Sequence, residues 1–140
     1  MMKKSMLVIT LLLLLIGCNN SSSVISELNM KDLNKDVATF LGETKETNGI
    51  YLFSRVNEKQ YLILNNMHIN QNENATYIKS IEPEIQGRTL VLKIVELSTE
   101  NLNDERVGKL KVYKLNREIE YDTIRIFKNE KETKIDLVGG

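Results

Sequence analysis

Short apolar segments separated by polar loops run from Gly49 to the C-terminus and predict a succession of β-strands. Two of them, Ile50–Val56 and Gln60–Leu64, are apolar on both faces, which is typical of strands in the middle of a layered structure. The segments recur roughly every 8 to 15 residues with turn residues between them. The expected strands are Ile50–Val56, Gln60–Leu64, Tyr77–Ile81, Thr89–Leu97, Val107–Leu115, Thr123–Phe127 and Lys134–Val138. We therefore predict a mainly all-β fold, a small antiparallel sandwich or barrel of about seven strands.

A proline and a polar turn give more specific predictions for two of the strands. Pro83 lacks the N–H donor of a sheet ladder, so it ends its strand or holds that strand at a sheet edge. The last two strands are expected to form a closing hairpin across residues 129–131.

Residues 26–48 predict a short helix or an extended arm ahead of the β-rich domain at 49–140. Four apolar residues recur at the spacing of one helical face: Leu33, Val37, Phe40 and Leu41. Gly42 follows them where a C-cap glycine belongs, which predicts a helix within Ser26–Leu41. Asparagine and aspartate at four positions weaken helix propensity, so an arm with a strand at Val37–Leu41 is the alternative.

The first eighteen residues have the layout of a secretory signal. Two lysines precede an eleven-residue, largely apolar run from Met6 to Ile16, and a small residue and a cysteine follow. A helix of that length reaches only about 16 Å, whereas the hydrocarbon core of a bilayer is about 30 Å thick. The run is therefore too short for a comfortable membrane span, and we expect residues 1–17 to be an export signal.

The end of this signal, Leu15-Ile16-Gly17-Cys18, resembles the lipobox of bacterial lipoproteins. In this resemblance Leu15 is the large apolar residue, Gly17 precedes the cleavage point and Cys18 is the lipidated residue, whereas Ile16 stands where a smaller residue is commoner. The resemblance implies a diacylglyceryl thioether on Cys18, whose two acyl chains give stable membrane attachment. Cys18 is also the only cysteine of the chain, so no intramolecular disulfide competes for it.

Composition bears on where the anchored domain lies. Removal of residues 1–17 takes two lysines and leaves 17 basic and 19 acidic side chains, a formal charge of −2. No strong positive field favours nucleic acid or an anionic membrane surface. Residues 18–25 are polar enough for a spacer behind the lipid. Abundant lysine, isoleucine and asparagine favour a low-GC Gram-positive bacterium as the source. The domain would then lie on the outer side of the cell membrane. In a Gram-negative cell, asparagine rather than aspartate at position 19, directly after the cysteine, would permit sorting of the lipoprotein to the outer membrane.

Side chains that support catalysis are scarce. The one histidine, His68, lies beside an asparagine-rich segment, and the one cysteine is assigned to the anchor. A nucleophile-and-base pair is therefore not recognisable. Glycine-rich phosphate loops and clusters of histidine and cysteine are also missing from the sequence. We expect no catalytic residues, no cofactor and no transition-metal site.

Alternating carboxylates are one remaining candidate for a binding site. Glu118, Glu120 and Asp122 recur at every second position, so an extended strand would place them on one face. Calcium favours several oxygen ligands, which makes these three residues candidate metal ligands. The alternative is the solvated side of an edge strand.

A lysine-rich strand face is the other candidate. In Val107–Leu115, Leu110 and Val112 are expected to face inward, and three residues are expected outward: Lys109, Lys111 and Tyr113. With Arg125 nearby, if the strands pair, this face would contact a polyanion such as teichoic acid or lipid headgroups. Outward lysines are also the ordinary protection of an edge strand.

The recognisable anchor and the poor catalytic inventory favour a membrane-anchored lipoprotein with a non-catalytic binding domain. Its partner would be a protein, a peptide or a cell-wall component. An extracytoplasmic folding factor such as a prolyl isomerase is one alternative, because its pocket can be mostly apolar. A protease inhibitor that uses an exposed loop at 65–76 or 98–106 is the other.

Replacement of Cys18 by alanine tests the anchor. Because the Cys18 thiol is the atom that would accept the diacylglyceryl group, we expect the C18A chain to remain an uncleaved precursor and to lose incorporation of labelled fatty acid completely. Metabolic labelling followed by electrophoresis measures both effects. Ser22→Ala in the spacer is the control and should be processed and labelled as wild type. Normal labelling of C18A would rule out the lipobox.

Overall fold

The computed structural model describes residues 24–116 and 118–140. The predicted signal, the cleavage residue Gly17, the lipidation residue Cys18 and nearly all of the spacer lie outside the described residues. No helix in the described ranges is both long and apolar enough to cross a membrane. The elements are β1 Ile25–Leu28, a 3-10 turn Met30–Asp32, α2 Lys35–Thr44, β2 Gly49–Phe53, β3 Gln60–Asn65, β4 Ala75–Gln86, β5 Thr89–Thr99, β6 Leu110–Leu115, β7 Thr123–Lys128, β8 Lys131–Thr133 and β9 Leu137–Gly139.

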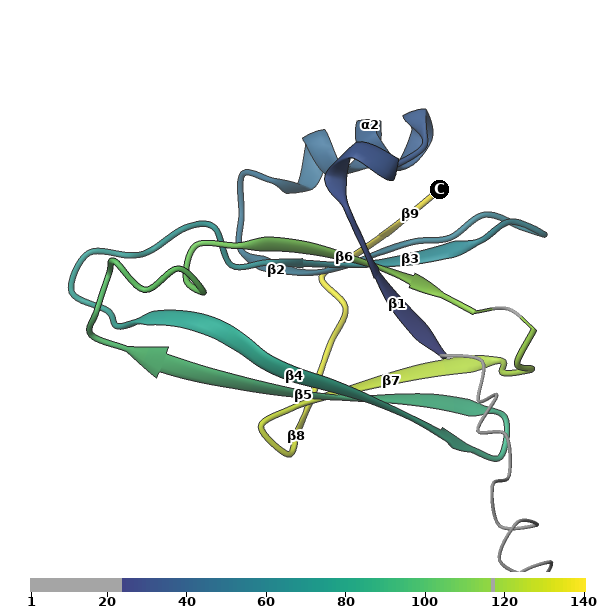
Figure 1. Cartoon of the computed structure of the whole chain (residues 1–140). Helices are drawn as coiled ribbons and strands as arrows, with labels where there is room; N and C mark the ends of the chain where they lie inside the picture. Colours follow the sequence, from purple (N-terminus) through teal and green to yellow (C-terminus); the bar gives the residue numbers. More distant parts are fainter. Residues whose placement is uncertain (1–23, 117) are drawn as a thin grey trace, which may run out of the picture.

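Two β-sheets pack face to face, and α2 covers the outer side of one of them (Figure 1). Sheet A has the strand order β1-β6-β3-β2-β9, and sheet B has the order β4-β5-β7-β8. The predicted mainly β fold with a short N-terminal helix is confirmed. Of the two predicted architectures, the structure has the sandwich, because the sheets of the described chain do not close into a barrel.

Sheet A is buried on both faces, as the two-sided apolar pattern of β2 and β3 predicts. One face packs against α2 through Val37, Phe40, Tyr51, Phe53, Tyr61, Ile63 and Val112. The other face packs against sheet B through Ile50, Leu52, Leu62, Leu64, Tyr113 and Leu115, which meet Leu90, Leu92, Ile94 and Ile126. Each fully buried side chain of this size stabilises the fold by about 1.5–3 kcal/mol. The central sheet therefore joins two hydrophobic layers.

The predicted orientation of Tyr113 is wrong. Its side chain is only 7% exposed and lies between the sheets, since each face of β6 is covered by a different layer. Leu110 and Val112 do pack inward, on the side of α2.

The C-terminal part of the chain divides between the two sheets. Asn129 and Glu130 both have positive φ, and Lys128 pairs with Lys131, so a two-residue turn joins β7 to β8. The chain then crosses to sheet A, where β9 pairs with β2 in parallel. The predicted single strand at Lys134–Val138 is therefore wrong. Pro83 lies within β4, which is an edge strand of sheet B as predicted.

Helix α2 begins later and ends later than the sequence predicts. Asn34 caps its first turn by accepting the N–H of Val37 at 2.9 Å, and the helix continues through Gly42 to Thr44. Gly42 is therefore not a C-cap, and the alternative strand at Val37–Leu41 is wrong. Residues 25–28, ahead of the helix, form β1, which pairs with β6.

A buried asparagine at the end of β3 fixes the C-terminal end of α2. The Nδ2 atom of Asn65 lies 2.9–3.0 Å from the carbonyl oxygens of Thr44, Lys45 and Thr47. Its Oδ1 accepts the N–H of Met67 at 2.9 Å. The last carbonyls of a helix have no partner within the helix, and the two N–H groups of this amide are shared among carbonyls at and just beyond the end of α2.

Two glycines allow the packing of β9 on α2 to be tested. A Cβ at Gly139 would overlap the Phe40 ring, whereas a Cβ at Gly42 would meet nothing within 4 Å. We expect Gly139→Ala to cost about 1–3 kcal/mol of unfolding free energy through overpacking. Gly42→Ala, in a helix interior, should be neutral or stabilise the protein by up to about 1 kcal/mol. Urea unfolding of the mature chain measures both, and equal stability of the two variants would contradict the placement of β9.

Candidate functional site

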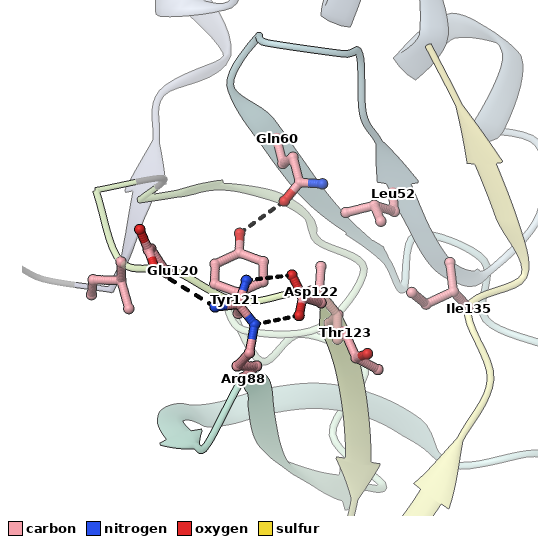
Figure 2. A pocket seen from close by; sticks show the side chains of 10 residues that line it. Leu52, Gln60, Arg88, Glu120, Tyr121, Asp122, Thr123 and Ile135 are labelled. Atoms are coloured by element: carbon pink, nitrogen blue, oxygen red, sulfur yellow. Dashed lines mark hydrogen bonds and ion pairs between the residues drawn. The ribbon is translucent and has the colours of Figure 1, made fainter.

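A pocket of about 670 Å³ opens between the two sheets at one end of the sandwich. We call it the intersheet mouth (Figure 2). Its lining residues are Leu52, Gln60, Arg88, Ile119, Glu120, Tyr121, Asp122, Thr123, Ile124 and Ile135. Sheet A supplies the first two, the β4–β5 turn supplies Arg88, and the connection from β6 into β7 supplies most of the others. The site therefore brings together segments that are distant in sequence.

Arg88 fastens the β4–β5 turn to the β6–β7 connection. Gly87 has a φ of 60°, a left-handed conformation that glycine adopts without strain, and it turns the chain into Arg88. The carbonyl oxygen of Arg88 accepts the N–H of Asp122 at 2.7 Å. Its guanidinium donates to both carboxylate oxygens of Asp122, from Nε at 2.5 Å and from Nη2 at 2.8 Å. Such a bidentate pair fixes direction as well as distance.

Charge in the mouth is slightly negative. Hydrogen bonding from Arg88, with its positive charge as a further cause, lowers the pKa of Asp122, and the same contact raises the pKa of Arg88. Both groups therefore stay charged at neutral pH. Glu120 lies 3.6 Å from the Arg88 guanidinium and its side chain is 85% exposed, so water screens that contact strongly. One cation thus faces two acids.

A neutral hydrogen-bond chain forms the opposite rim. The Tyr121 hydroxyl donates to Oε1 of Gln60 at 2.8 Å, and Nε2 of Gln60 donates to the Ser54 hydroxyl at 2.8 Å. Below this rim, Leu52 belongs to the intersheet core, and Ile124 and Ile135 pack against it. We call these three apolar residues the apolar floor of the mouth, and Figure 2 shows Leu52 and Ile135 to one side of the Tyr121–Gln60 contact. The mouth can therefore hold an apolar group under a ring of polar groups.

The three candidate calcium ligands lie in a bend, not on the extended strand that their spacing predicts. Glu120 and Asp122 meet at Arg88, whereas Glu118 is exposed and its backbone N–H donates to Oδ1 of Asn116. Across residues 24–116 and 118–140, no group of three or more histidine, cysteine, aspartate or glutamate residues is placed to hold a metal ion.

The predicted lysine-rich face is not assembled. Lys111 lies 3.5 Å from Glu27. Arg125 belongs to the other sheet, where it donates to Glu132 at 2.8 and 2.9 Å and stacks 5.1 Å from the centre of the Phe127 ring. Because β6 and β7 lie in different sheets, Arg125 does not join the lysines of β6.

His68 connects two loops. Its Nε2 lies 2.7 Å from the carbonyl oxygen of Lys45, its N–H donates to Oδ1 of Asn48, and its carbonyl oxygen accepts from Nδ2 of Asn48. These contacts tie the loop after β3 to the loop after α2. The observed role of His68 is thus to connect the backbones of these two loops by hydrogen bonds.

Comparison of the chain with known protein families, curated proteins and solved structures gives no match. The site must therefore be argued from its own geometry. Sequence reasoning singled out Glu120 and Asp122 but missed Arg88 and Gln60. The Gly87-Arg88 turn is a local signal for an exposed arginine, yet nothing local connects it to an aspartate 34 residues later.

Asp122→Asn tests the Arg88 contact through pH. The lowered pKa means that the Asp122 carboxylate stabilises the fold at pH values above its unfolded pKa of about 3.9, and that this contribution is lost as pH falls through its folded pKa. We expect D122N to have a slightly lower Tm than wild type at neutral pH, with the gap closing in acid. Thermal unfolding across this pH range measures it. Asp32→Asn, at an exposed residue away from the mouth, is the control, and a gap that widens in acid would contradict the assignment.

Proposed function

We propose that this chain is a lipid-anchored extracytoplasmic binding protein, and that its intersheet mouth holds a peptide segment of a partner protein. The observation that carries the proposal is the apolar floor of the mouth beneath a rim of hydrogen-bonding and charged groups. Ligand sites commonly combine an apolar surface with a few placed polar groups. The resemblance of Leu15–Cys18 to a lipobox supports the anchored location.

Each part of the mouth suits a part of a peptide. The partly buried Ile124 and Ile135, backed by the buried Leu52, offer apolar surface to one side chain of the ligand. The Gln60 amide and the Tyr121 hydroxyl can exchange their mutual hydrogen bond for bonds to a peptide backbone. Glu120 is the more loosely held acid, so it is available to a lysine or arginine of the ligand. The ligand class is therefore an apolar residue beside a basic one.

Selection from a phage-displayed library of random peptides tests this proposal on the mature chain. We expect enrichment of peptides with an apolar residue next to lysine or arginine. Glu120→Lys should weaken the selected peptides at least tenfold, about 1.4 kcal/mol, because it reverses the charge that meets the basic residue. Glu100→Lys, exposed and outside the mouth, is the matched control and should bind as wild type.

Equal binding by the two lysine variants, or failure to enrich any peptide, would contradict a peptide site in the mouth. The apolar floor also meets the requirement of a prolyl isomerase pocket. Accelerated isomerisation of a proline peptide that E120K reduces and E100K does not would replace binding by catalysis at the same site.

A further inference from the structure

The chain enters the domain beside the intersheet mouth. The carbonyl oxygen of Val24 accepts the N–H of Asn116 at 2.8 Å. Ile25 then pairs with Leu115, and Leu115 pairs on its other side with Gln60 of the mouth. Neighbouring strands lie about 4.8 Å apart, so the backbones of Ile25 and Gln60 are separated by about 10 Å. Val24 and Ile25 also pack against the same hydrophobic cluster as Ile124 and Ile135, which line the pocket; Figure 1 shows β1 and β7 in the two facing sheets.

Covalent geometry limits how far this point can stand from the lipid. Val24 follows Cys18 by six residues. A chain spans at most about 3.6 Å per residue, so the two residues lie within about 22 Å of each other whatever the conformation between them. With the further distance of about 10 Å from Ile25 to Gln60, the backbone at the mouth lies within about 32 Å of the lipid-bearing residue.

The opposite end of the sandwich is not confined in this way. Strand β5 leaves the mouth at Thr89 and ends at Thr99. At about 3.3 Å per residue it carries the chain about 35 Å away before the loop that contains Asn103. The two ends of the domain can thus stand at very different heights above a membrane.

We infer that the intersheet mouth faces the membrane surface and docks an extracytoplasmic segment of a membrane-embedded protein. This inference rests on the proposed lipid anchor. Charge favours a protein segment over lipid headgroups, because the lining of the mouth holds two acids against one arginine that is already bound to Asp122. Anionic headgroups attract clusters of lysine and arginine instead. The docked segment carries an apolar residue beside a basic one and lies close to the bilayer.

Energy transfer from two labelled positions measures the orientation. The Cys18 thiol is consumed by the lipid, so one introduced cysteine is a unique labelling site. Gln86→Cys reports on the mouth end and Asn103→Cys on the far end, and both residues are exposed. The donor-labelled lipoprotein is placed in phosphatidylcholine vesicles that carry acceptor-labelled headgroups. We expect several-fold more transfer from position 86 than from position 103, and equal or reversed transfer would overturn the inference.

A longer spacer is the matched control. Insertion of twenty glycine and serine residues after Ser23 leaves the domain unchanged but lengthens the tether to a root-mean-square span of about 28 Å, with a far greater maximum. The difference in transfer between the two labels should then shrink. Flotation with the vesicles tests the lipid anchor separately from the orientation of the mouth. A chain that does not float overturns the anchor and this inference together, whereas a floating chain with equal transfer overturns the orientation alone.

A photoactivated cross-linker at position 86 identifies the class of partner in membranes of the cell that makes the lipoprotein. We expect an adduct with an integral membrane protein that is reduced at least tenfold both by Glu120→Lys and by the long spacer, and that is kept in Glu100→Lys. Adducts with lipid alone would overturn the protein partner. Transfer from position 86 that rises with the phosphatidylglycerol content of the vesicles would do the same, since it indicates docking on headgroups.

Discussion

Burial of sheet A on both faces is the constraint on which the rest of the structure depends. Helix α2 covers one face and sheet B covers the other, so neither face of the central strands is available for binding. This arrangement requires α2 to end at a defined position over β3. The Asn65 amide fixes that position, because its nitrogen lies within hydrogen-bond distance of the carbonyl oxygens of Thr44, Lys45 and Thr47. A buried carbonyl left without a donor costs about 1–3 kcal/mol, so the amide matters as much as the apolar contacts around it. Binding is left to the ends and the outer surfaces of the sandwich.

The ends and outer surfaces of the sandwich differ in whether their polar side chains already bind other groups of the protein. On the outer face of sheet B, Lys93 binds Glu84 and Arg125 binds Glu132, as on an ordinary solvated sheet. The end of the sandwich opposite the mouth has a smaller pocket of about 310 Å³. There the Asp136 carboxylate accepts the N–H of Ile50, so this carboxylate already bonds to the backbone of β2. At the intersheet mouth the Arg88 carbonyl also holds backbone, but the Tyr121–Gln60 and Arg88–Asp122 contacts join side chains that a ligand can reach.

The parts of the fold that local pattern dictates were predictable, and those that long-range pairing dictates were not. β2 and β3 were predicted because apolar residues on both faces need two covering layers. β1 and β9 are short, partly exposed edge strands, so their sequences carry little apolar signal. The acids at 118–122 have the spacing of a strand but lie in a bend, since the chain must cross there from one sheet to the other. The mouth could not be predicted, because its central contact joins Arg88 to an aspartate far along the chain.

Strand direction, more than composition, decides at which end of the domain the chain ahead of β1 emerges. β6 runs toward the mouth and ends beside Gln60. Because β1 pairs with β6 in the antiparallel sense, β1 must begin at the mouth, and any tether ahead of it emerges there. A parallel pairing of the same four residues would place Ile25 beside Val112, about 10 Å further from the mouth, and would point the preceding chain away from the mouth. The direction of one short edge strand therefore sets which end of the sandwich a lipid on Cys18 would hold at the membrane.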